Sequence, residues 1–511
     1  MRKRFRRCTA AQAVEMISSG STVASGGFVG AAHPEALSAA LEKRFLETGQ
    51  PRDLTLAYAA GQGDGKTRGL NHLAHEGLIS RVIGGHWALA PKLGALAVSG
   101  RIQAYNFPQG VMCQLFRDIA AGRPGCITHI GLDTFADPQV DGGVLNANTP
   151  RTMVERIELG GRPWLWYKAF PIHVAMIRAS AVDPLGNLVM DDEVVVGEVL
   201  AIAQAAHNSG GIVLAQVARV LDHPAPPQTV RVPGILVDAV VVAEDGEHDH
   251  TFAEKYNEGY ITAAKPGQNV WASLERLPMD ERRIIASRAC DEVPENAIAN
   301  LGIGMPEGIA RIAAERGLLD HFTLTVESGP IGGMPAGGLS FGASLHPHAI
   351  VDQPSQFDFY DGRALDFAAL GAAQIDAQGN VNVSRFGPRL AGIGGFANIT
   401  QTARKLVFCG TFTTGGLEVA VEDGKLRIIQ EGQHRKFVPQ VEHRSFSAAR
   451  ARVVGQEVLY VTERAVFRLD EDGLELIEIA PGIDLENQVL ALMAFRPRVR
   501  NVKLMASHVL A

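Results

Sequence analysis

The feature that most constrains the fold is a pair of sequence patterns that recurs, in the same order, in the two parts of the chain. The stretch GFVGAAHPEALSAALEKR, which begins at Gly27, resembles NLGIGMPEGIARIAAERG, which begins at Asn300. Both run from glycines into Pro-Glu, a favourable start for a helix, and then into a helical pattern. A second pair follows, because SAVDPLGNLVM around Asp183 and AAQIDAQGNVNV around Asp376 each contain a turn that leads into an apolar strand. Two ordered matches predict an internal duplication.

Within each part, apolar strand-like runs alternate with helical stretches. The runs DLTLAYA, GIVLAQVARVL, LTLTVE and KLVFCGTF read as buried strands, whereas PEALSAALEKRF and PEGIARIAAER have helical spacing. This alternation predicts an α/β fold with two similar open, mostly parallel sheets in tandem. A polar, turn-rich stretch marks the junction between the parts. We therefore predict an N-terminal half at residues 1–275 and a C-terminal half at residues 276–511.

Charge and cysteine content exclude several classes of protein. The 511 residues carry a formal net charge of −7 and no basic run of the kind that binds nucleic acid. No apolar stretch reaches the ~18 residues of a membrane-spanning helix, so we expect no membrane partner. The basic start MRKRFRR lacks the apolar run of a signal peptide. The cysteines are odd in number and include no Cys-x-x-Cys pair, which favours a reducing cytoplasm and argues against disulfides or structural zinc.

The densest chemical signal is HFTLTVESGPIGGMPAGG, in which a carboxylate stands where a short strand ends. Residues 322–326 read as a buried strand, Glu327 follows, and residues 328–338 are rich in glycine and proline. Ligands of open α/β sheets bind beyond the carboxyl ends of the strands, so we expect Glu327 at the mouth of a site. A carboxylate there serves as a base, a metal ligand or a nucleophile, or it merely caps the glycine loop.

A metal site is not expected around this carboxylate. A metal ion needs further Asp, Glu or His ligands, and the glycine-rich segment supplies none. The histidine pairs His248/His250 and His346/His348 are expected to be loop residues, because neither pair has an evident third ligand nearby in the sequence.

VESGPIGG, together with NLGIGMPEG upstream and GIGGFANI downstream, resembles the active-site signature of the family I CoA-transferases. In the first half, SGGFVGAAHPE, GQGDG, IGGHW, AYNFPQG and GLDTFADP resemble the fused-chain acetate/propionate and 3-ketoacid members, so the likeness covers nearly the whole chain. The resemblance implies transfer of CoA between a short-chain acyl-CoA and a free carboxylate through a glutamyl-CoA thioester. It assigns the acyl or carboxylate side to the N-terminal half and the nucleophile to the C-terminal half.

The resemblance also implies roles for individual residues. Glu327 is the catalytic nucleophile. The oxyanion and substrate loops are represented by Gly394, Gly395, Gln109, Gly27, Phe28 and Gly30, with one of the first two donating its N–H to the oxyanion, and the CoA-binding residues are Gly302, Gly304, Met305 and Gly392. No metal and no permanently bound cofactor are implied, CoA being a substrate, and the likeness implies a homodimer or homotetramer. Some relatives carry an Asn where this chain has Ala36. The hydrogen-bond donor assigned to that Asn is therefore not expected here.

Three other interpretations stay open at the level of the sequence. Acyl-CoA hydrolysis on the same scaffold replaces the acceptor acid with water, and the sequence barely separates the two reactions. AGQGDGKT at residues 60–67 matches a relaxed phosphate-binding loop, although Gly69 is a poor residue for the first turn of the helix that such a loop requires. A non-enzymatic ligand sensor leaves the glycine-framed Glu327 unexplained.

Overall fold

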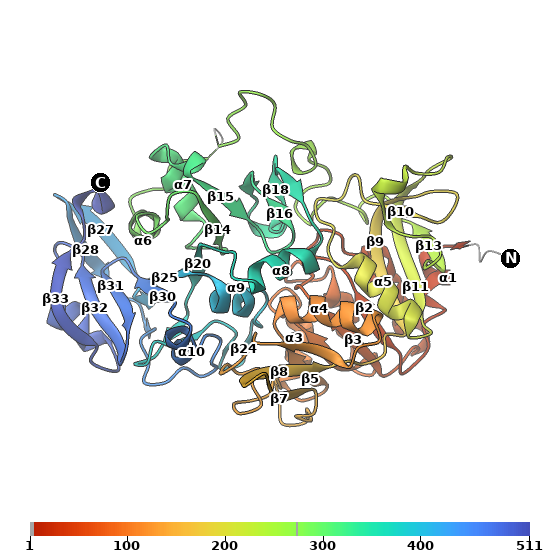
Figure 1. Cartoon of the computed structure of the whole chain (residues 1–511), viewed down its shortest axis with the longest axis horizontal. Helices are drawn as coiled ribbons and strands as arrows, with labels where there is room; N and C mark the ends of the chain where they lie inside the picture. The colour runs from red at the N-terminus through yellow and green to blue at the C-terminus, as the bar shows by residue number, and fades with distance from the viewer. Residues whose placement is uncertain (1–4, 272–273) are drawn as a thin grey trace. The chain divides into compact units, whose positions relative to one another are not determined.

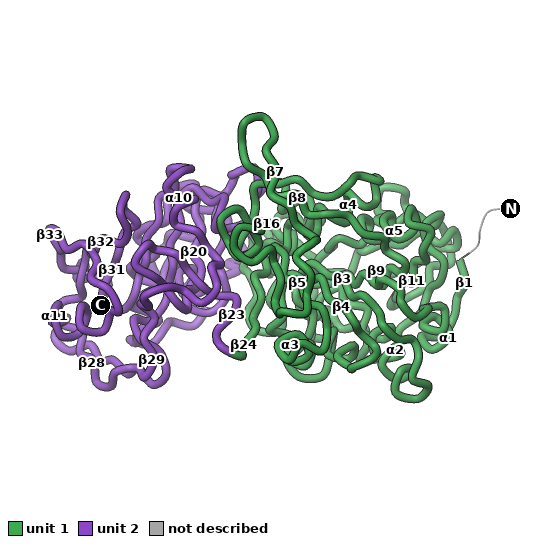
Figure 2. Tube along the Cα trace, turned by 90° about the horizontal axis from the view of Figure 1, so that it is seen from below, with its two compact units in different colours: residues 1–266, 326–358, 388–398 green, residues 267–325, 359–387, 399–511 purple. Residues whose placement is uncertain are grey.

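The computed structural model (Figure 1) describes residues 5–271 and 274–511, which form two compact units. Unit 1 contains the described residues up to Pro266 together with Val326–Asp358 and Pro388–Asn398, and unit 2 contains the remainder (Figure 2). The segment that carries Glu327 therefore packs within unit 1. The predicted halves, 1–275 and 276–511, are defined by the repeat in the sequence. The two units are defined by packing and do not test these halves, which remain a prediction.

Unit 1 is built on an open sheet whose main path is parallel throughout. Its order is β1-β13-β11-β9-β2-β3-β4-β5, and every neighbouring pair is parallel. The strands are β1 (Arg6–Arg7), β2 (Thr22–Ser25), β3 (Leu54–Tyr58), β4 (Ile79–Gly84), β5 (Gln103–Asn106), β9 (Val174–Val182), β11 (Ile212–Val220) and β13 (Ala239–Val242). All residues of β9 are buried, as expected for a central strand of a sheet that is covered on both faces.

Helices cover both faces of this sheet. Helices α4 (Gln109–Ala120) and α5 (Val199–Asn208) pack together on one face, and α1 (Ala10–Val14) and α2 (Glu35–Thr48) on the other (Figure 1, Figure 2). α3 (Pro91–Val98) follows β4. The start of α2 directly after Pro34 confirms the helix that the first Pro-Glu pattern predicts.

Shorter antiparallel elements complete unit 1. They are a sheet of β6 (Gly125–Thr128), β8 (Arg162–Lys168) and β7 (Val154–Leu159), an edge of β10 (Leu188–Val189) and β12 (Val230–Val232), and the pairs β16 (Pro330–Ile331) with β19 (Ala349–Ile350) and β17 (Met334–Pro335) with β18 (Ser344–Leu345). The last two pairs fold the glycine-rich segment after Glu327 back on itself.

Unit 2 is built on a second open sheet. Its strands follow the order β15-β14-β20-β25-β30-β31-β32-β33, parallel up to β30 and antiparallel through β32. They are β14 (Ala297–Leu301), β15 (Phe322–Thr325), β20 (Phe367–Gly371), β25 (Lys405–Cys409), β30 (Glu457–Val461), β31 (Ala465–Asp470), β32 (Gly473–Ile479) and β33 (Arg498–Leu504). The helices of this region include α6 (Glu281–Cys290), α7 (Gly308–Glu315) and α10 (Ala448–Val453).

Two open, mostly parallel sheets with flanking helices confirm the predicted α/β class. Among the helices of the described residues, none has both the length and the apolar character needed to cross a membrane.

The two Asp-x-x-Gly-Asn turns of the sequence are built in the same way. One carboxylate oxygen of Asp183 accepts the N–H groups two and four residues further on, at 2.8 and 2.9 Å, and the other accepts the Asn187 side-chain amide at 2.9 Å. Asp376 makes the same three bonds, at 3.1 and 3.0 Å to the backbone and 3.1 Å to the Asn380 side chain. This shared geometry supports the internal duplication.

The Asp183 turn is expected to stabilise unit 1 measurably. Asp183 is fully buried and also accepts the Ala225 N–H at 3.0 Å, so Asp183→Ala leaves one buried and three part-buried N–H groups without their acceptor. We expect a loss of about 3 kcal/mol, because each buried unpaired donor costs about 1–3 kcal/mol. Denaturant or thermal unfolding followed by circular dichroism measures it. Asp222→Ala is the control, since that side chain is 95% exposed; equal effects of the two substitutions would contradict the assignment.

Candidate active site

Glu327 lies on a tight turn that follows β15. The Gly329 N–H donates to the Val326 C=O at 3.0 Å, and the Val326 N–H donates to the Pro330 C=O at 3.0 Å. The chain therefore reverses around Glu327 and Ser328. The Glu327 side chain is nearly enclosed, with the residue only 9% exposed. The predicted position of this carboxylate at the end of a short strand is confirmed.

Further hydrogen bonds fix this turn, which we call the Glu327 turn (residues 326–330), directly after the carboxylate. Gly329 has a φ of +127°, and a Cβ there would lie 2.1 Å from the Val351 carbonyl oxygen, so only glycine fits. The Val351 N–H donates back to the Gly329 C=O at 3.1 Å. The Ser328 hydroxyl donates to the Gly342 C=O at 2.6 Å. The backbone that presents Glu327 is thus held in one conformation.

Helix α8 (Gln353–Asp361) connects the Glu327 turn to the start of α4. The Gln356 side-chain amide donates to the Val326 C=O at 3.2 Å. The next residue, Phe357, packs against Gly110, where a Cβ would lie 2.6 Å from the phenyl ring. Adjacent residues of one helix therefore contact the residue before Glu327 and the residue after Gln109.

The loops that carry IGGHW, AYNFPQG and GIGGF meet in unit 1. The Gly394 N–H donates to the Gly85 C=O at 2.8 Å, and the Gln109 N–H donates to the Gly394 C=O at 2.9 Å. The Ile393 N–H donates to the Asn106 side-chain oxygen at 2.9 Å. Segments that are far apart in the sequence thus form one hydrogen-bonded group around two of the predicted site residues.

This hydrogen-bonded group separates the two predicted oxyanion donors. The N–H of Gly394 is engaged with the Gly85 carbonyl, so within this pair the N–H of Gly395 is the better candidate. A Cβ on Gly394 would lie 3.5 Å from the His86 ring and 3.7 Å from the Gln109 side-chain oxygen. Those two side chains therefore flank the glycine pair.

Gln109 is the predicted donor with the most unusual surroundings. It is the first residue of α4 and is only 3% exposed. Its backbone N–H is bonded, but its side-chain nitrogen Nε2 is buried without a hydrogen-bond partner among the described residues. Buried polar groups are normally paired, and an unpaired donor costs about 1–3 kcal/mol. A ligand oxygen that binds here is a physical reason for retaining it.

Phe28 lies one contact away from the Glu327 turn. Its ring is 5.5 Å from that of Phe341, centroid to centroid, and a Cβ on Gly342 would lie 2.4 Å from it. Because the Ser328 hydroxyl is bonded to the carbonyl of Gly342, the predicted first-half loop packs against the residues that hold the Glu327 turn.

The two glycines of that first-half loop face protein atoms. A Cβ on Gly30 would lie 2.4 Å from the Phe252 ring, and one on Gly27 would lie 3.0 Å from the His33 backbone. Both glycines therefore allow the chain to pack closely against itself. Their role in lining an acyl pocket remains a prediction.

The residues predicted to bind CoA fall into both units. Gly302, Gly304 and Met305 lie in unit 2 between β14 and α7, where the Gly302 N–H donates to the Ala369 C=O at 2.8 Å. Gly392 lies in unit 1 and forms a β-bridge with His86. CoA binding by these four residues remains a prediction.

Asn106 and His86 lie beside the predicted site residues but were not singled out from the sequence. The Asn106 amide donates to the carbonyls of Gly84 and Gly85 at 2.9 and 2.6 Å, so Asn106 joins two loops to the end of its own strand. Burial lowers the pKa of His86 to about 4, so its ring is neutral at neutral pH. Both residues lie inside sequence motifs, Asn106 in AYNFPQG and His86 in IGGHW. The motifs indicated that these loops matter, but not which of their residues do.

The phosphate-loop interpretation of residues 60–67 is wrong. The Asp64 carboxylate accepts the N–H groups of the residues two, three and four positions further on, at 2.8, 2.8 and 3.0 Å. A carboxylate there occupies the amides that a phosphate needs and repels the anion. The element that follows is a short 3-10 helix, Leu70–Leu73, and not the α-helix of such a loop.

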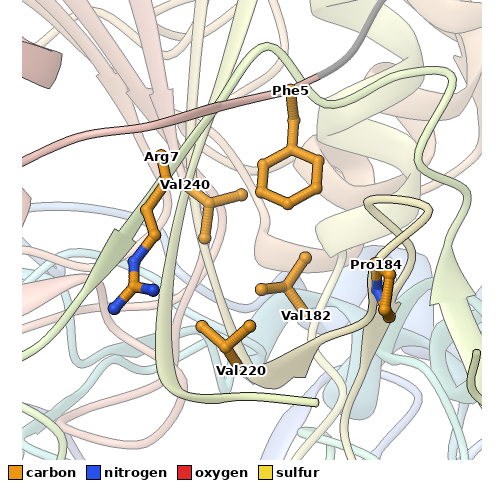
Figure 3. Close-up of a pocket in the computed structure, with 6 residues that line it drawn as sticks. All are labelled: Phe5, Arg7, Val182, Pro184, Val220 and Val240. Atoms are coloured by element: carbon orange, nitrogen blue, oxygen red, sulfur yellow. The ribbon is translucent and has the colours of Figure 1, made fainter. Parts of the chain in front are cut away.

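A surface cavity of about 390 Å³ lies elsewhere in unit 1, at one end of the sheet (Figure 3). It is lined by Phe5, Arg7, Val182, Pro184, Val220 and Val240. Arg7 is the one charged side chain of the six, and none of the predicted site residues is among them. Within the described ranges, no three His, Cys, Asp or Glu side chains are grouped as a metal site requires.

Comparisons with known proteins agree with this arrangement of motifs. A family model described as Coenzyme A transferase matches residues 7–243. Over 96% of its length the chain is 41% identical to the acetate CoA-transferase YdiF of Escherichia coli, of which it covers 92%. The chain belongs to the coenzyme A transferase family. Together with the match to the whole chain, this identifies a fused-chain family I CoA-transferase.

Two further similarities support the assignment of this CoA-transferase. The chain is 42% identical to the caffeate CoA-transferase of Acetobacterium woodii over 96% of its own length and 94% of that protein. Its structure resembles that of the YdiF apoenzyme from Escherichia coli O157:H7, with a TM-score of 0.94 and 39% identity over 100% of this chain and 97% of the other.

The unpaired Gln109 amide gives a test that separates catalysis from stability. We expect Gln109→Leu to lower kcat for CoA transfer by ~100-fold or more, the usual cost of losing an oxyanion donor. The melting temperature should stay unchanged or rise, because the substitution removes an unpaired buried donor.

Gln114→Leu on the same helix is the matched control for this test. Its amide is satisfied by the Pro354 C=O at 3.0 Å and the Asp358 carboxylate at 2.6 Å, so its loss should lower stability and should reduce kcat far less than Gln109→Leu does. The donor assignment would be contradicted by a Gln109→Leu enzyme that melts earlier and keeps its activity.

Proposed function

We propose that this enzyme transfers CoA between a short-chain acyl-CoA and a free carboxylate, with Glu327 as the nucleophile of a ping-pong reaction. The observation that carries the proposal is a nearly enclosed carboxylate on a fixed turn, joined through α8 to a buried amide without a partner. The acceptor and donor acids belong to the acetate, propionate or 3-keto acid class.

The reaction consists of acyl transfers to and from Glu327. A carboxylate oxygen attacks the thioester carbonyl, the C–S bond breaks, and CoA leaves as a thiolate, which gives an acyl-glutamyl anhydride. The thiolate then attacks the glutamyl carbonyl and releases the first acid as its carboxylate. The product is a glutamyl-CoA thioester, which an incoming carboxylate converts by the reverse steps. A carboxylate nucleophile is ionised at neutral pH in general and needs no base.

Each of these steps passes through an oxyanion that needs preorganised donors. The Gly395 N–H and the Gln109 side-chain amide are the proposed donors, because the Gly394 N–H is already bonded to Gly85. Removing one such donor typically costs about 3–4 kcal/mol of transition-state stabilisation. The hydrogen bonds that fix the loops around them hold these groups in place before substrate binds.

Enclosure of the carboxylate favours transfer over hydrolysis. A glutamyl-CoA thioester survives until the acceptor acid arrives only if water is kept away from its carbonyl. Glu327 is 9% exposed and its turn packs against Gly342, which in turn contacts the Phe28 ring. Acyl-CoA hydrolysis remains the second candidate on the same residues.

The partners and location follow the same resemblance. Acetate and caffeate appear in the names of two relatives, which span small and aromatic acids, so the acid pocket is proposed to be the variable part of the site. We further propose a homodimer or homotetramer in the cytoplasm that has no permanently bound cofactor and takes CoA as a substrate.

Isotope transfer distinguishes the two candidate reactions. Propionyl-CoA is mixed with labelled acetate, and labelled acetyl-CoA and free CoA are followed by liquid chromatography and mass spectrometry. We expect labelled acetyl-CoA to form at the rate at which propionyl-CoA disappears, and Glu327→Ala to abolish both. The acceptor is then varied across acetate, propionate and 3-keto acids. Release of free CoA with no labelled acyl-CoA product from any of these acceptors would establish a hydrolase instead.

A further inference from the structure

Glu198 is a buried carboxyl group that the proposed reaction does not use. It lies at the start of α5 and is only 1% exposed. Both of its carboxyl oxygens are buried, and apart from its own backbone N–H neither has a hydrogen-bond partner among the described residues. An ionised carboxylate with so little compensation is unfavourable in the protein interior, so this geometry favours the neutral acid.

The surroundings of Glu198 agree with a neutral acid. Desolvation, together with the nearby negative charge of Asp352, raises its pKa from the usual 4.5 to about 8. Asp352 is the one charged side chain whose effect on Glu198 is resolved among the described residues. Gly197, the residue before Glu198, accepts the Gln353 N–H at 3.0 Å, so Glu198 is adjacent to the start of α8.

Gln353 supplies an acceptor that matches this acid. Its side-chain amide nitrogen donates to the Cys113 sulfur at 3.1 Å, which leaves its side-chain oxygen to accept. That oxygen is buried and has no partner among the residues that the structure describes. A neutral carboxylic acid has one O–H to donate, whereas a carboxylate beside the same oxygen would place two acceptors together.

We propose that Glu198 is a positioning residue that donates its carboxyl O–H to the Gln353 side-chain oxygen, directly or through one buried water, and so holds the first turn of α8. This inference rests on the proposed function, because α8 in turn holds the Glu327 turn. The connection runs through the bonds of Val351 to Gly329 at 3.1 Å and of the Gln356 side chain to Val326 at 3.2 Å.

Ionisation of Glu198 at alkaline pH should loosen the start of α8. The carboxylate then repels both Asp352 and the Gln353 oxygen, and the one stabilising contact resolved for it, from its own backbone N–H, is outweighed by the loss of solvation. The same ionisation destabilises the fold: because the folded pKa is raised, the contribution of Glu198 to stability is present below pH 4.5 and is lost as the pH rises through about 8. Glu198→Gln keeps a donor for Gln353 and cannot ionise.

Thermal unfolding tests the charge state of Glu198 without reference to activity. Between about pH 5 and pH 8, the melting temperature of Glu198→Gln should rise steadily relative to the wild type, and above about pH 8 the difference should level off. Glu193→Gln is the matched control, because that carboxylate is also buried but is paired with Arg178 at 3.0 Å and has its pKa lowered to about 2. It should lower the melting temperature by an amount that varies little over the same range.

Hydrogen–deuterium exchange and kinetics test the positioning role. In the wild type, exchange of the segments holding Val351 and Gln353, corrected for the intrinsic pH effect, should accelerate above about pH 8, and kcat should fall by roughly tenfold per pH unit. Glu198→Gln should show neither change and should keep kcat within about threefold at neutral pH. Glu198→Leu, which offers no donor, should exchange faster and lose kcat at every pH, with KM little changed.

Two results would overturn the inference. A constant difference in melting temperature between Glu198→Gln and the wild type would show that the carboxyl is not a neutral acid. Parallel exchange and parallel alkaline loss of activity in the two proteins would show that it does not position α8. Hydrogen–deuterium exchange is measured without substrate. If the wild type failed to transfer CoA, the proposed function would be refuted, and the exchange result would still test whether Glu198 positions α8.

Discussion

The contact on which the proposed site depends is the hydrogen bond from the Gln356 side chain to the Val326 carbonyl, at 3.2 Å. It ties helix α8 to the residue immediately before Glu327, and the Val351 N–H ties the chain before α8 to Gly329. Glu327 is therefore presented by a turn whose two ends are both held. A nucleophile that must attack one carbonyl and then serve as an acyl carrier benefits from such fixed geometry, because misplacement of reacting groups costs rate steeply.

Some of the buried polar groups without partners lie on α4 and α8 or at the start of α5. The donor Nε2 of Gln109, the acceptor Oε1 of Gln353 and the carboxyl of Glu198 are among them. Each costs stability in the absence of a partner, and a fold selected for stability alone would remove or pair them. The proposed reaction accounts for Gln109 through a substrate oxyanion. The proposed acid–amide contact accounts for Glu198 and Gln353 together.

Local sequence patterns predicted the features that depend on short stretches of chain. The alternation of apolar runs and helical stretches gave the parallel sheets, because strand and helix periodicities are written within ten or so residues. The strand end at Glu327 follows from a few adjacent residues, and the turns at Asp183 and Asp376 follow from their five-residue pattern.

Contacts between distant segments could not be predicted in this way. The role of Gln356 depends on a residue 30 positions earlier, and the bond between Gly110 and Asn398 spans 288 positions. Nothing in the local sequence marks Gln356, and the motifs that contain Gly110 and Asn398 do not indicate that these two residues are bonded. The phosphate-loop interpretation failed for a related reason: the glycine spacing was present, but the Asp64 side chain had already taken the backbone amides. Glu198 is unremarkable in sequence, and only burial without partners reveals it.

Mass spectrometry of the covalent intermediate tests the central claim most directly. The enzyme is incubated with an acyl-CoA in the absence of acceptor acid, quenched in acid and digested. The account predicts that the peptide containing Glu327 gains the mass of CoA less one water, and that this adduct is absent from Glu327→Ala. An enzyme that transfers CoA while this peptide stays unmodified, or that carries the adduct on another peptide, would contradict it.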